Sequence, residues 1–399
     1  MKKTLLTICL TWMCFSLSAQ KIIDLSGKWS FSIDRQDNGE KEKWFSHTLN
    51  DCINLPGSMP EKLKGDEVTA KTQWTGSLYD SSYYYNPYME KYRKEGNIKF
   101  PFFLTPDKHY VGAAWYQKEV NIPADWKGER ILLFLERPHI ETTVWVNGQK
   151  TGMQNSLCVP HQYDITRYVR PGKCTITIRV DNRIKEINVG PDSHSITDQT
   201  QGNWNGIVGR ICLQTTPKTY FDDIQIYPEP EQKLARVKVV IKGAGITKIK
   251  LSAESFNTDK KHIVPAIQQE IKLNKGVTET EMVLPMGNDM LLWDEFHPAL
   301  YKLKAEVTNG KKTEIKEIQF GMRRFEIKGK WFYVNGRKTQ LRGTVENCDF
   351  PLTGYAPMDV ESWERVFRIC RSYGLNHMRF HSFCPPEAAF IAADRVGFY

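Results

Sequence analysis

Short runs of alternating apolar and polar residues, broken by turn residues, fill the chain from Leu25 to about Pro217. Such alternation is typical of β-strands with one buried face. The clearest runs are 115–120, 130–135, 142–146 and 175–180. Asn147 and Gly148 follow one of them directly, and both residue types tolerate the positive φ of a two-residue hairpin turn. Many short strands between turn signals predict a β-sandwich.

A second β region extends from Thr219 to about Gln319, with strands expected near 237–241, 246–253 and 301–307. Its length of roughly 100 residues fits an immunoglobulin-like sandwich. No cluster of reactive side chains stands out in it. We therefore interpret it as a spacer that sets the first domain against the segment after Gln319.

The pattern changes after Phe320. A strand-like run at 338–345 precedes a helix that Asp359 caps and Gly374 ends, and residues 375–380 form a second strand. A second helix follows Pro385-Pro386 and ends at Gly397, after which Phe398-Tyr399 would begin a third strand. Strands that alternate with helices indicate parallel strands with crossover helices, here the first units of a (β/α)₈ TIM barrel. A complete barrel takes about 250 residues, so we expect only its start here.

The first residues are those of a secretory signal. Lys2 and Lys3 precede an apolar run at 5–17, and Ser18-Ala19 ends it. The alternative, a membrane anchor, needs about 20 apolar residues. We expect a signal peptide at 1–19, export to the periplasm or the exterior, no membrane span, and domains at 20–218, 219–319 and 320–399.

The charge pattern and the cysteines bear on which partners and cofactors we expect. Loss of the two leader lysines takes the net charge from +9 to +7, but the lysines are scattered and form no arginine-rich stripe, so we expect no nucleic-acid partner. Of nine cysteines, seven follow the leader, with no CxxC pair and no histidine at zinc spacing. We expect no metal site and no cofactor, and cysteines that act mostly as small buried residues. One disulfide is possible, but the sequence does not select it.

Colinear motifs along the chain resemble family 2 glycoside hydrolases, the group of β-galactosidases, β-glucuronidases and β-mannosidases. The motifs are Asp24-Leu-Ser-Gly-Lys-Trp-Ser-Phe31, Ala114-Trp-Tyr-Gln-Lys-Glu-Val120, Val144-Trp-Val-Asn-Gly148, Asn205-Gly-Ile-Val-Gly-Arg-Ile211, His297-Pro-Ala-Leu-Tyr301 and Phe320-Gly-Met-Arg-Arg-Phe-Glu326. The resemblance implies a sugar-binding jelly-roll domain, an immunoglobulin-like domain and a catalytic barrel, in that order.

The resemblance also implies retaining hydrolysis of O-glycosidic bonds by two glutamates, an acid/base and a nucleophile, with carboxyl groups about 5 to 5.5 Å apart. In the family they follow barrel strands four and seven. We therefore expect no catalytic residue before Tyr399, and interpret the chain as the N-terminal part of an exported exo-glycosidase of oligo- or polysaccharides, inactive alone. A non-catalytic carbohydrate-binding β-sandwich protein stays an alternative, and the coding sequence downstream would distinguish the two.

The second barrel strand supplies two candidate substrate-binding residues. Side chains alternate along a strand, so Met378 and Phe380 should face the helices while His377, Arg379 and His381 face the interior. Arg379 and His381 stand at the carboxyl end, where barrel sites lie. They could bind sugar or satisfy barrel carboxylates. The family usually shows Arg, two residues, then His-Tyr, so the histidine here is displaced by one.

Two further pairs are candidates. Glu346 and Asp349 replace the family's Asn-Arg-His-Glu stretch, which suggests a substrate other than simple β-galactosides. They could bind sugar hydroxyls or be solvated. Asn203 and Trp204 match the loop by which the first domain reaches over the barrel mouth. Asn203 could bind a hydroxyl and Trp204 could stack on a sugar ring, or both could serve ordinary loop packing.

Overall fold

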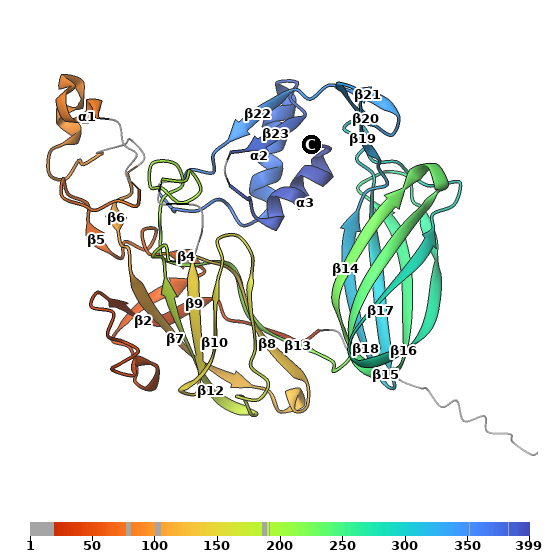
Figure 1. Ribbon diagram of the computed structural model, residues 1–399, viewed down its shortest axis with the longest axis horizontal. Coiled ribbons are helices and arrows are strands. Elements are labelled where there is room, and N and C mark those ends of the chain that lie inside the picture. The colour runs from red at the N-terminus through yellow and green to blue at the C-terminus, as the bar shows by residue number, and fades with distance from the viewer. Residues whose placement is uncertain are drawn as a thin grey trace, which may run out of the picture.

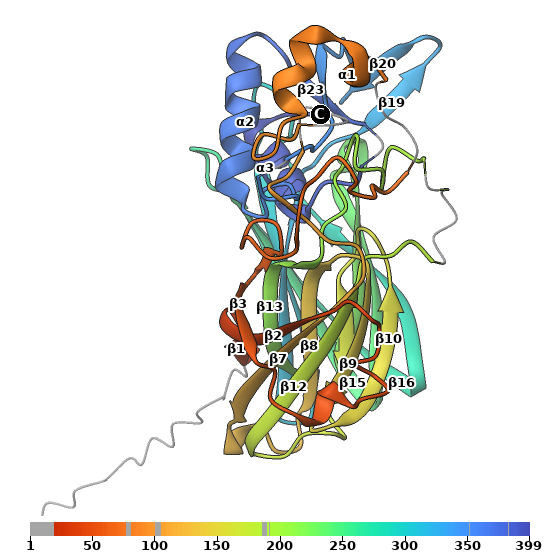
Figure 2. The ribbon, with the colours of Figure 1, turned by 90° about the vertical axis from the view of Figure 1, so that its left-hand side faces the viewer.

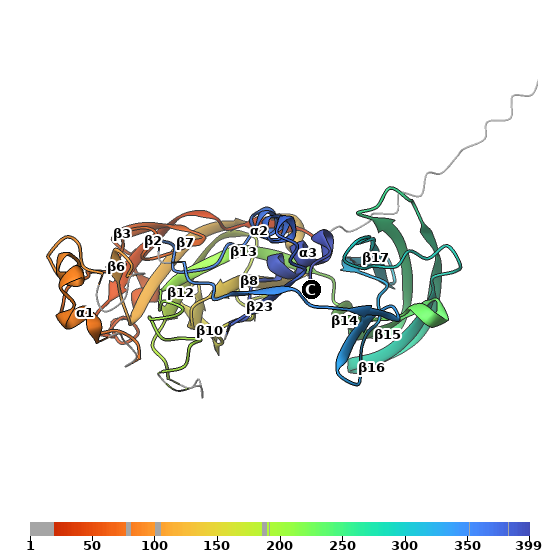
Figure 3. The same ribbon diagram turned by 90° about the horizontal axis from the view of Figure 1, so that it is seen from above.

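The computed structural model describes residues 20–76, 81–99, 105–185, 190, 192–350, 352–381 and 383–399, so the expected signal peptide lies outside the described residues. Two β domains lie side by side, and helices α2 (Val360–Ser372) and α3 (Glu387–Val396) sit between them at one end (Figure 1). The view from above gives the same order, with both helices between the two domains (Figure 3). No helix in the described part is long and apolar enough to cross a membrane.

The first β domain is a sandwich of two sheets, as the alternation predicted. One sheet has the order β1-β13-β8-β11, with β4 on β13, and the other β10-β9-β12-β7-β2-β3. The strands are β1 (Ile22–Asp24), β2 (Gly27–Asp34), β3 (Asp51–Leu55), β4 (Gly57–Ser58), β7 (Ala113–Ile122), β8 (Arg130–Pro138), β9 (Glu141–Val146), β10 (Gln149–Asn155), β11 (His161–Asp164), β12 (Gly172–Asp181) and β13 (Gly206–Thr216), with 3₁₀ turns η1 (Trp44–Ser46) and η3 (Ala124–Trp126).

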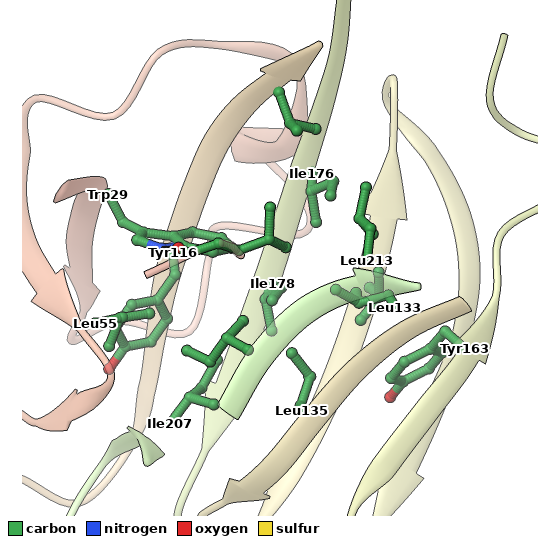
Figure 4. Packing of buried hydrophobic residues seen from close by; sticks show 14 of the residues in the cluster. Trp29, Leu55, Tyr116, Leu133, Leu135, Tyr163, Ile176, Ile178, Ile207 and Leu213 are labelled. Carbon is green, nitrogen blue, oxygen red and sulfur yellow. Dashed lines mark hydrogen bonds between the residues drawn. The ribbon is translucent and has the colours of Figure 1, made fainter. Parts of the chain in front are cut away.

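Apolar side chains from the two sheets meet in one core. Ile176 and Ile178 of β12 face Leu133 and Leu135 of β8 between the layers (Figure 4), and all four are buried. Burial of such side chains stabilises the fold by about 1.5 to 3 kcal/mol each. The predicted hairpin is confirmed, because Asn147 and Gly148 both have positive φ between β9 and β10.

An insertion leaves the sandwich at one edge. The short strands β5 (Asp66–Glu67) and β6 (Lys108–His109) pair at its base. α1 (Ser82–Tyr85) and η2 (Pro87–Tyr92) form a lobe that lies away from α2 and α3 in Figure 1 and in front of them in Figure 2. The Thr75 amide donates to Asp198 Oδ2 at 2.7 Å. The insertion is thereby tied to the loop that precedes β13.

The second β domain is an immunoglobulin-like sandwich. Its strands are β14 (Tyr220–Glu229), β15 (Leu234–Phe256), β16 (Ile263–Pro285), β17 (Leu300–Asn309) and β18 (Lys312–Phe320), with η4 (Pro230–Gln232) after β14. The two strands expected at 237–241 and 246–253 are one continuous strand, β15, with an irregular register between Gly243 and Gly245. Its first half pairs with β14 and its second half with β17, so one long strand serves both parts of the domain.

The predicted run at 338–345 is wrong as a single strand. It divides into β21 (Arg337–Thr339), which closes an antiparallel sheet with β19 (Phe325–Lys328) and β20 (Trp331–Val334), and β22 (Gly343–Glu346). The reason lies in Asn376, whose Oδ1 accepts from the Arg342 amide at 2.7 Å and whose Nδ2 donates to the Gln340 carbonyl at 3.1 Å. These bonds hold the chain out of strand pairing between the two segments.

The predicted βα units are confirmed. β22 and β23 (His377–Phe380) are parallel, with Gly343 opposite His377 and Glu346 opposite Phe380. Asp359 caps α2, since its Oδ1 accepts from the Ser362 amide at 2.7 Å. Residue Tyr399 continues the ladder on the far side of β23, because its amide donates to the Asn376 carbonyl at 2.8 Å and its carbonyl accepts from Met378 at 3.0 Å.

A buried carboxylate of the second β domain, that of Glu295, helps to hold these units in place. Glu295 is 7 % exposed, and its Oε2 accepts from Arg342 Nη2 at 3.0 Å and from Asn376 Nδ2 at 2.8 Å. Its carbonyl also accepts from Arg371 of α2 at 2.6 Å. This buried carboxylate therefore fixes both the start of β22 and the start of β23, which is the spacer role expected of the domain.

Candidate functional site

The carboxyl ends of β22 and β23 form the rim on which four of the predicted residues lie. Parallel pairing brings the ends of both strands to one edge, and the His381 amide donates to the Glu346 carbonyl at 2.9 Å just beyond the register. The predicted alternation is confirmed. Met378 is buried in the core under the helices with Phe380 packed against it, while Arg379 is exposed on the other face.

The loop after β22 turns back on itself at this rim. Glu346 Oε1 accepts from the Cys348 amide at 2.8 Å, and Cys348 is buried with a φ of 56°. Burial first, and then the charge of Glu346, raise the pKa of Asp349 to about 7. A carboxyl group with such a pKa is partly protonated near neutral pH and can donate a hydrogen bond as well as accept one.

A loop of the first β domain reaches this rim. Gln201 Nε2 donates to the Asn347 carbonyl, and the rings of His194 and His381 lie 5.3 Å apart at 37°. Neither Gln201 nor His194 was predicted from the sequence. The available signal was weak, because both stand in a polar stretch without a motif, and only the fold shows that this stretch meets the end of β23.

Asn203 and Trp204 lie at the boundary between the domains and are both buried. Asn203 Nδ2 donates to Thr75 Oγ1 at 2.8 Å and to the Asn182 carbonyl at 3.1 Å. The Trp204 ring stacks on His139, with centroids 4.6 Å apart and planes at 20°, and Tyr355 lies 5.7 Å away. These contacts match the packing alternative. His139 covers one face of the Trp204 ring, and the predicted role of Trp204 in sugar binding stays a prediction.

A cavity of about 300 Å³ lies between the two parts of the chain. The first β domain contributes Arg137, His139, Leu157, Cys158, Ser195, Gln201, Gly202 and Trp204, and the loops after β22 and β23 contribute Cys348, Gly354, Tyr355, Ala356, Met358, Phe383 and Cys384. Burial, together with the Arg137 charge, lowers the pKa of His139 to about 3, so its ring is neutral. The volume is within the range of small-molecule pockets.

The cysteines and the potential metal ligands complete the chemistry of the chain. The seven described cysteines are free thiols, of which Cys174, Cys212 and Cys348 are buried and Cys52 and Cys384 exposed. Within the described ranges no group of three or more His, Cys, Asp or Glu side chains could hold a metal ion.

Two family descriptions match the chain. "Glycosyl hydrolases family 2, sugar binding domain" covers residues 22–217, and "Glycosyl hydrolases family 2" covers residues 219–323. The first match spans the sandwich of β1 to β13 and the second spans the immunoglobulin-like domain.

Two curated relatives and one solved structure are similar to larger parts of the chain. Human β-glucuronidase is 23 % identical over 94 % of this chain and 56 % of its own length. A β-galactosidase of Thermoanaerobacter pseudethanolicus is 24 % identical over 75 % of this chain and 40 % of its own length. The structure of the Ruminococcus gnavus β-glucuronidase in complex with D-glucuronic acid covers 95 % of this chain and 58 % of its own, at 19 % identity and a TM-score of 0.69.

The likeness to the solved structure concerns the fold. The chain spans about half the length of the relatives that it matches, 56 % of the human protein and 40 % of the bacterial one. The order of a sugar-binding sandwich, an immunoglobulin-like sandwich and βα units agrees with the order that the motifs implied. The chain belongs to glycosyl hydrolase family 2.

Proposed function

We propose that residues 20–399 are the N-terminal part of an exported, retaining exo-glycosidase that cleaves O-glycosidic bonds in oligo- or polysaccharides. The observation that carries the proposal is the convergence at one rim. Glu346 and His381 follow parallel strands, and Gln201 of the sugar-binding domain donates to the loop between Glu346 and Asp349. Sites in barrel folds are built from loops at this end of the strands.

The proposed chemistry divides between this chain and a longer polypeptide. Retaining hydrolysis needs a general acid/base and a nucleophile, and the family resemblance assigns both to glutamates after barrel strands four and seven. We place those strands beyond Tyr399. The rim residues of this chain would bind and orient the sugar: Arg379 offers a forked set of donors, and Asp349 can donate to or accept from a hydroxyl. The names of the relatives support β-glucuronides and β-galactosides as the classes to test first.

Export is part of the same proposal. The leader pattern at 1–19 supports it, and the substrates of an exo-glycosidase of polymers lie outside the cell membrane. Detection of the protein in the periplasm or medium, with Gln20 at its N-terminus, is the expected result. A protein that kept residues 1–19 in the cytoplasm would contradict this part.

The experiment compares two proteins with a panel of aryl β-glycosides that includes the glucuronide and the galactoside. Residues 20–399 alone should give no turnover above a control without protein, and the polypeptide encoded by the open frame read on beyond Tyr399 should hydrolyse at least one member. The first product, observed by NMR, should keep the β configuration. Turnover by residues 20–399 that follows the protein through purification would refute the division of labour, and an inverted product would refute the retaining mechanism.

A further inference from the structure

Arg137 is a buried arginine near the end of β8 that meets no carboxylate among the described residues. Arg137 is 5 % exposed. Nη2 donates to the Cys158 carbonyl at 3.2 Å and to the Cys384 carbonyl at 2.8 Å, and the guanidinium lies over the Phe383 ring at 5.2 Å. Carbonyl dipoles and a ring face attract a cation, but they do not neutralise its charge.

A second buried arginine of the same domain, Arg179 on β12, shows the contrast. Arg179 bonds to Asp37 at 2.6 Å and to Asp181 at 3.0 Å, so its charge is compensated within the protein. Buried charges in proteins are ordinarily paired in this way, because an unpaired one loses its hydration without replacement. An arginine left without a carboxylate beside a cavity is therefore a candidate for binding an anion.

No described residue that lines the cavity next to Arg137 carries a negative charge. Of its described lining residues, Arg137 is the one that is charged at neutral pH. Burial raises the pKa of the Cys158 and Cys348 thiols, so neither supplies a thiolate. The neutral His139 adds no second positive charge. The described lining thus offers no charge to balance Arg137, in a volume of about 300 Å³ that also has aromatic walls from Trp204, Tyr355 and Phe383.

We propose that the cavity between the sugar-binding domain and the βα units binds a sugar acid, with Arg137 as the anchor for its carboxylate. One cation matches one carboxylate, whereas a phosphate monoester carries nearly two charges and would leave one uncompensated in a buried site. The two carbonyls take both hydrogens of Nη2, so Nη1 and Nε, which bond to no described residue, are the donors left for carboxylate oxygens. The aromatic side chains suit the apolar face of a sugar ring. That the acid is a sugar rests on the proposed function.

The first test uses the unaltered chain 20–399 and ligands that differ in charge alone. D-glucuronate and D-galacturonate are titrated by calorimetry against D-glucuronamide, which has the shape of glucuronate without the charge, and against inorganic phosphate. At least one uronate should bind about 10-fold or more tightly than the amide, which is about 1.4 kcal/mol. Equal binding of uronates and amide, no binding of either uronate, or tighter binding of phosphate would overturn the proposal.

Native thiols can locate the ligand. Cys384 lines the cavity and is exposed, whereas Cys52 is exposed on β3 in the other sheet of the sandwich and lines none of this cavity. The uronate that binds should slow alkylation of Cys384 by N-ethylmaleimide and leave Cys52 unaffected, as measured by peptide mass spectrometry. Equal protection of both thiols, or of neither, would place the ligand elsewhere and overturn the assignment.

Variants complete the test. Arg137→Gln should remove the preference for the uronate over the amide. Arg137→Lys keeps the charge but has fewer donors, so it should keep part of that preference. Arg210→Gln is the control, since Arg210 is exposed and already bonds to Glu136 at 3.0 Å. If Arg137→Gln fails to fold, the proposal is still tested on the unaltered chain, by the comparison of uronate with amide and by the protection of Cys384. Loss of uronate binding with hydrolysis intact in the longer protein would refute this inference alone, and binding without hydrolysis would refute the proposed function alone.

Discussion

The His381 amide donates to the Glu346 carbonyl at 2.9 Å, which joins the residue after β23 to the last residue of β22. This bond extends the parallel ladder past its last register pair, Glu346 opposite Phe380. Both side chains therefore start from the same edge of the sheet, and the acidic loop that begins at Glu346 lies next to the ring of His381. The parallel pairing of β22 and β23 thus places Glu346 and His381, two residues predicted separately to bind substrate, at one rim.

The pH dependence of stability should reveal Asp349. Burial and the Glu346 charge raise its pKa to about 7 from a usual 3.8. The folded state therefore keeps the proton between those values while the unfolded chain releases it, so the free energy of unfolding falls as pH rises through this range. Asp349→Asn removes that loss. Its Tm should exceed that of the unaltered protein increasingly from about pH 4 to about pH 7 and by a constant amount above.

Glu346→Gln is the matched control for Asp349. It removes the neighbouring charge that raises the Asp349 pKa, so the fall of Tm with pH should become shallower than in the unaltered protein. Thermal unfolding followed by fluorescence between about pH 4 and about pH 8 measures all three proteins. Parallel curves for Asp349→Asn and the unaltered chain would mean that Asp349 titrates normally.

Trp204 should fasten the sugar-binding domain to the loop after β22. Its ring stacks on His139 and lies 5.7 Å from the Tyr355 ring, and Trp204 is 5 % exposed. Trp204→Ala should cost about 3 to 5 kcal/mol of the free energy of unfolding, as loss of a buried tryptophan does. Tyr373→Ala, at a side chain that is 81 % exposed, should change it by about 0.5 kcal/mol or less. Limited proteolysis should release the segment after Gly343 from the first variant and not from the second.

Gly206 should tolerate no side chain. It opens β13 with φ of 149°, and a Cβ there would stand 2.9 Å from the Ser58 Cα and closer still to the Gly57 carbonyl oxygen. Gly206→Ala should therefore lower the free energy of unfolding by about 1 to 3 kcal/mol or more. Gly172→Ala has a φ of 107° but open space around its Cβ, so it should suffer the backbone strain alone. Denaturant unfolding of both variants checks the order, and an equal loss in both would contradict the clash.

The sequence predicted much of the fold because local signals agreed with the tertiary structure. Asp359 and Gly374 marked α2, and alternation separated Met378 from Arg379. The prediction from sequence failed where a residue far away along the chain determines the local structure. Nothing local to 338–345 shows that Asn376 bonds to the backbone at Gln340 and Arg342 and divides the run. The same limit made β15 look like two strands, since its pairing with β14 and then β17 is a long-range property.

The candidate site shows the same division. Glu346, Asp349, Arg379 and His381 could be placed at strand ends from the sequence alone. Gln201, His194 and Arg137 could not, because each reaches the boundary only through domain packing. Trp204 was recognised as a loop residue, but its burial between His139 and Tyr355 depends on a segment about 150 residues away along the chain, beyond the reach of local patterns.

The central claim is that the ends of β22 and β23 bind the substrate of a family 2 glycosidase, and Arg379 tests it most directly. The experiment compares three forms of the longer, hydrolytically active polypeptide: the unaltered protein, Arg379→Lys and Arg368→Lys. Arg368 is an exposed arginine on α2 that bonds to Glu364 at 3.1 Å, so its variant should keep full activity.

The measurement is kcat/KM with the best aryl glycoside, beside Tm for each protein. Arg379→Lys keeps the charge and loses the fork, so kcat/KM should fall about 10-fold or more at unchanged Tm, a loss of at least about 1.4 kcal/mol of transition-state stabilisation. Full activity of Arg379→Lys, equal to that of Arg368→Lys, would contradict the claim that this rim holds the substrate.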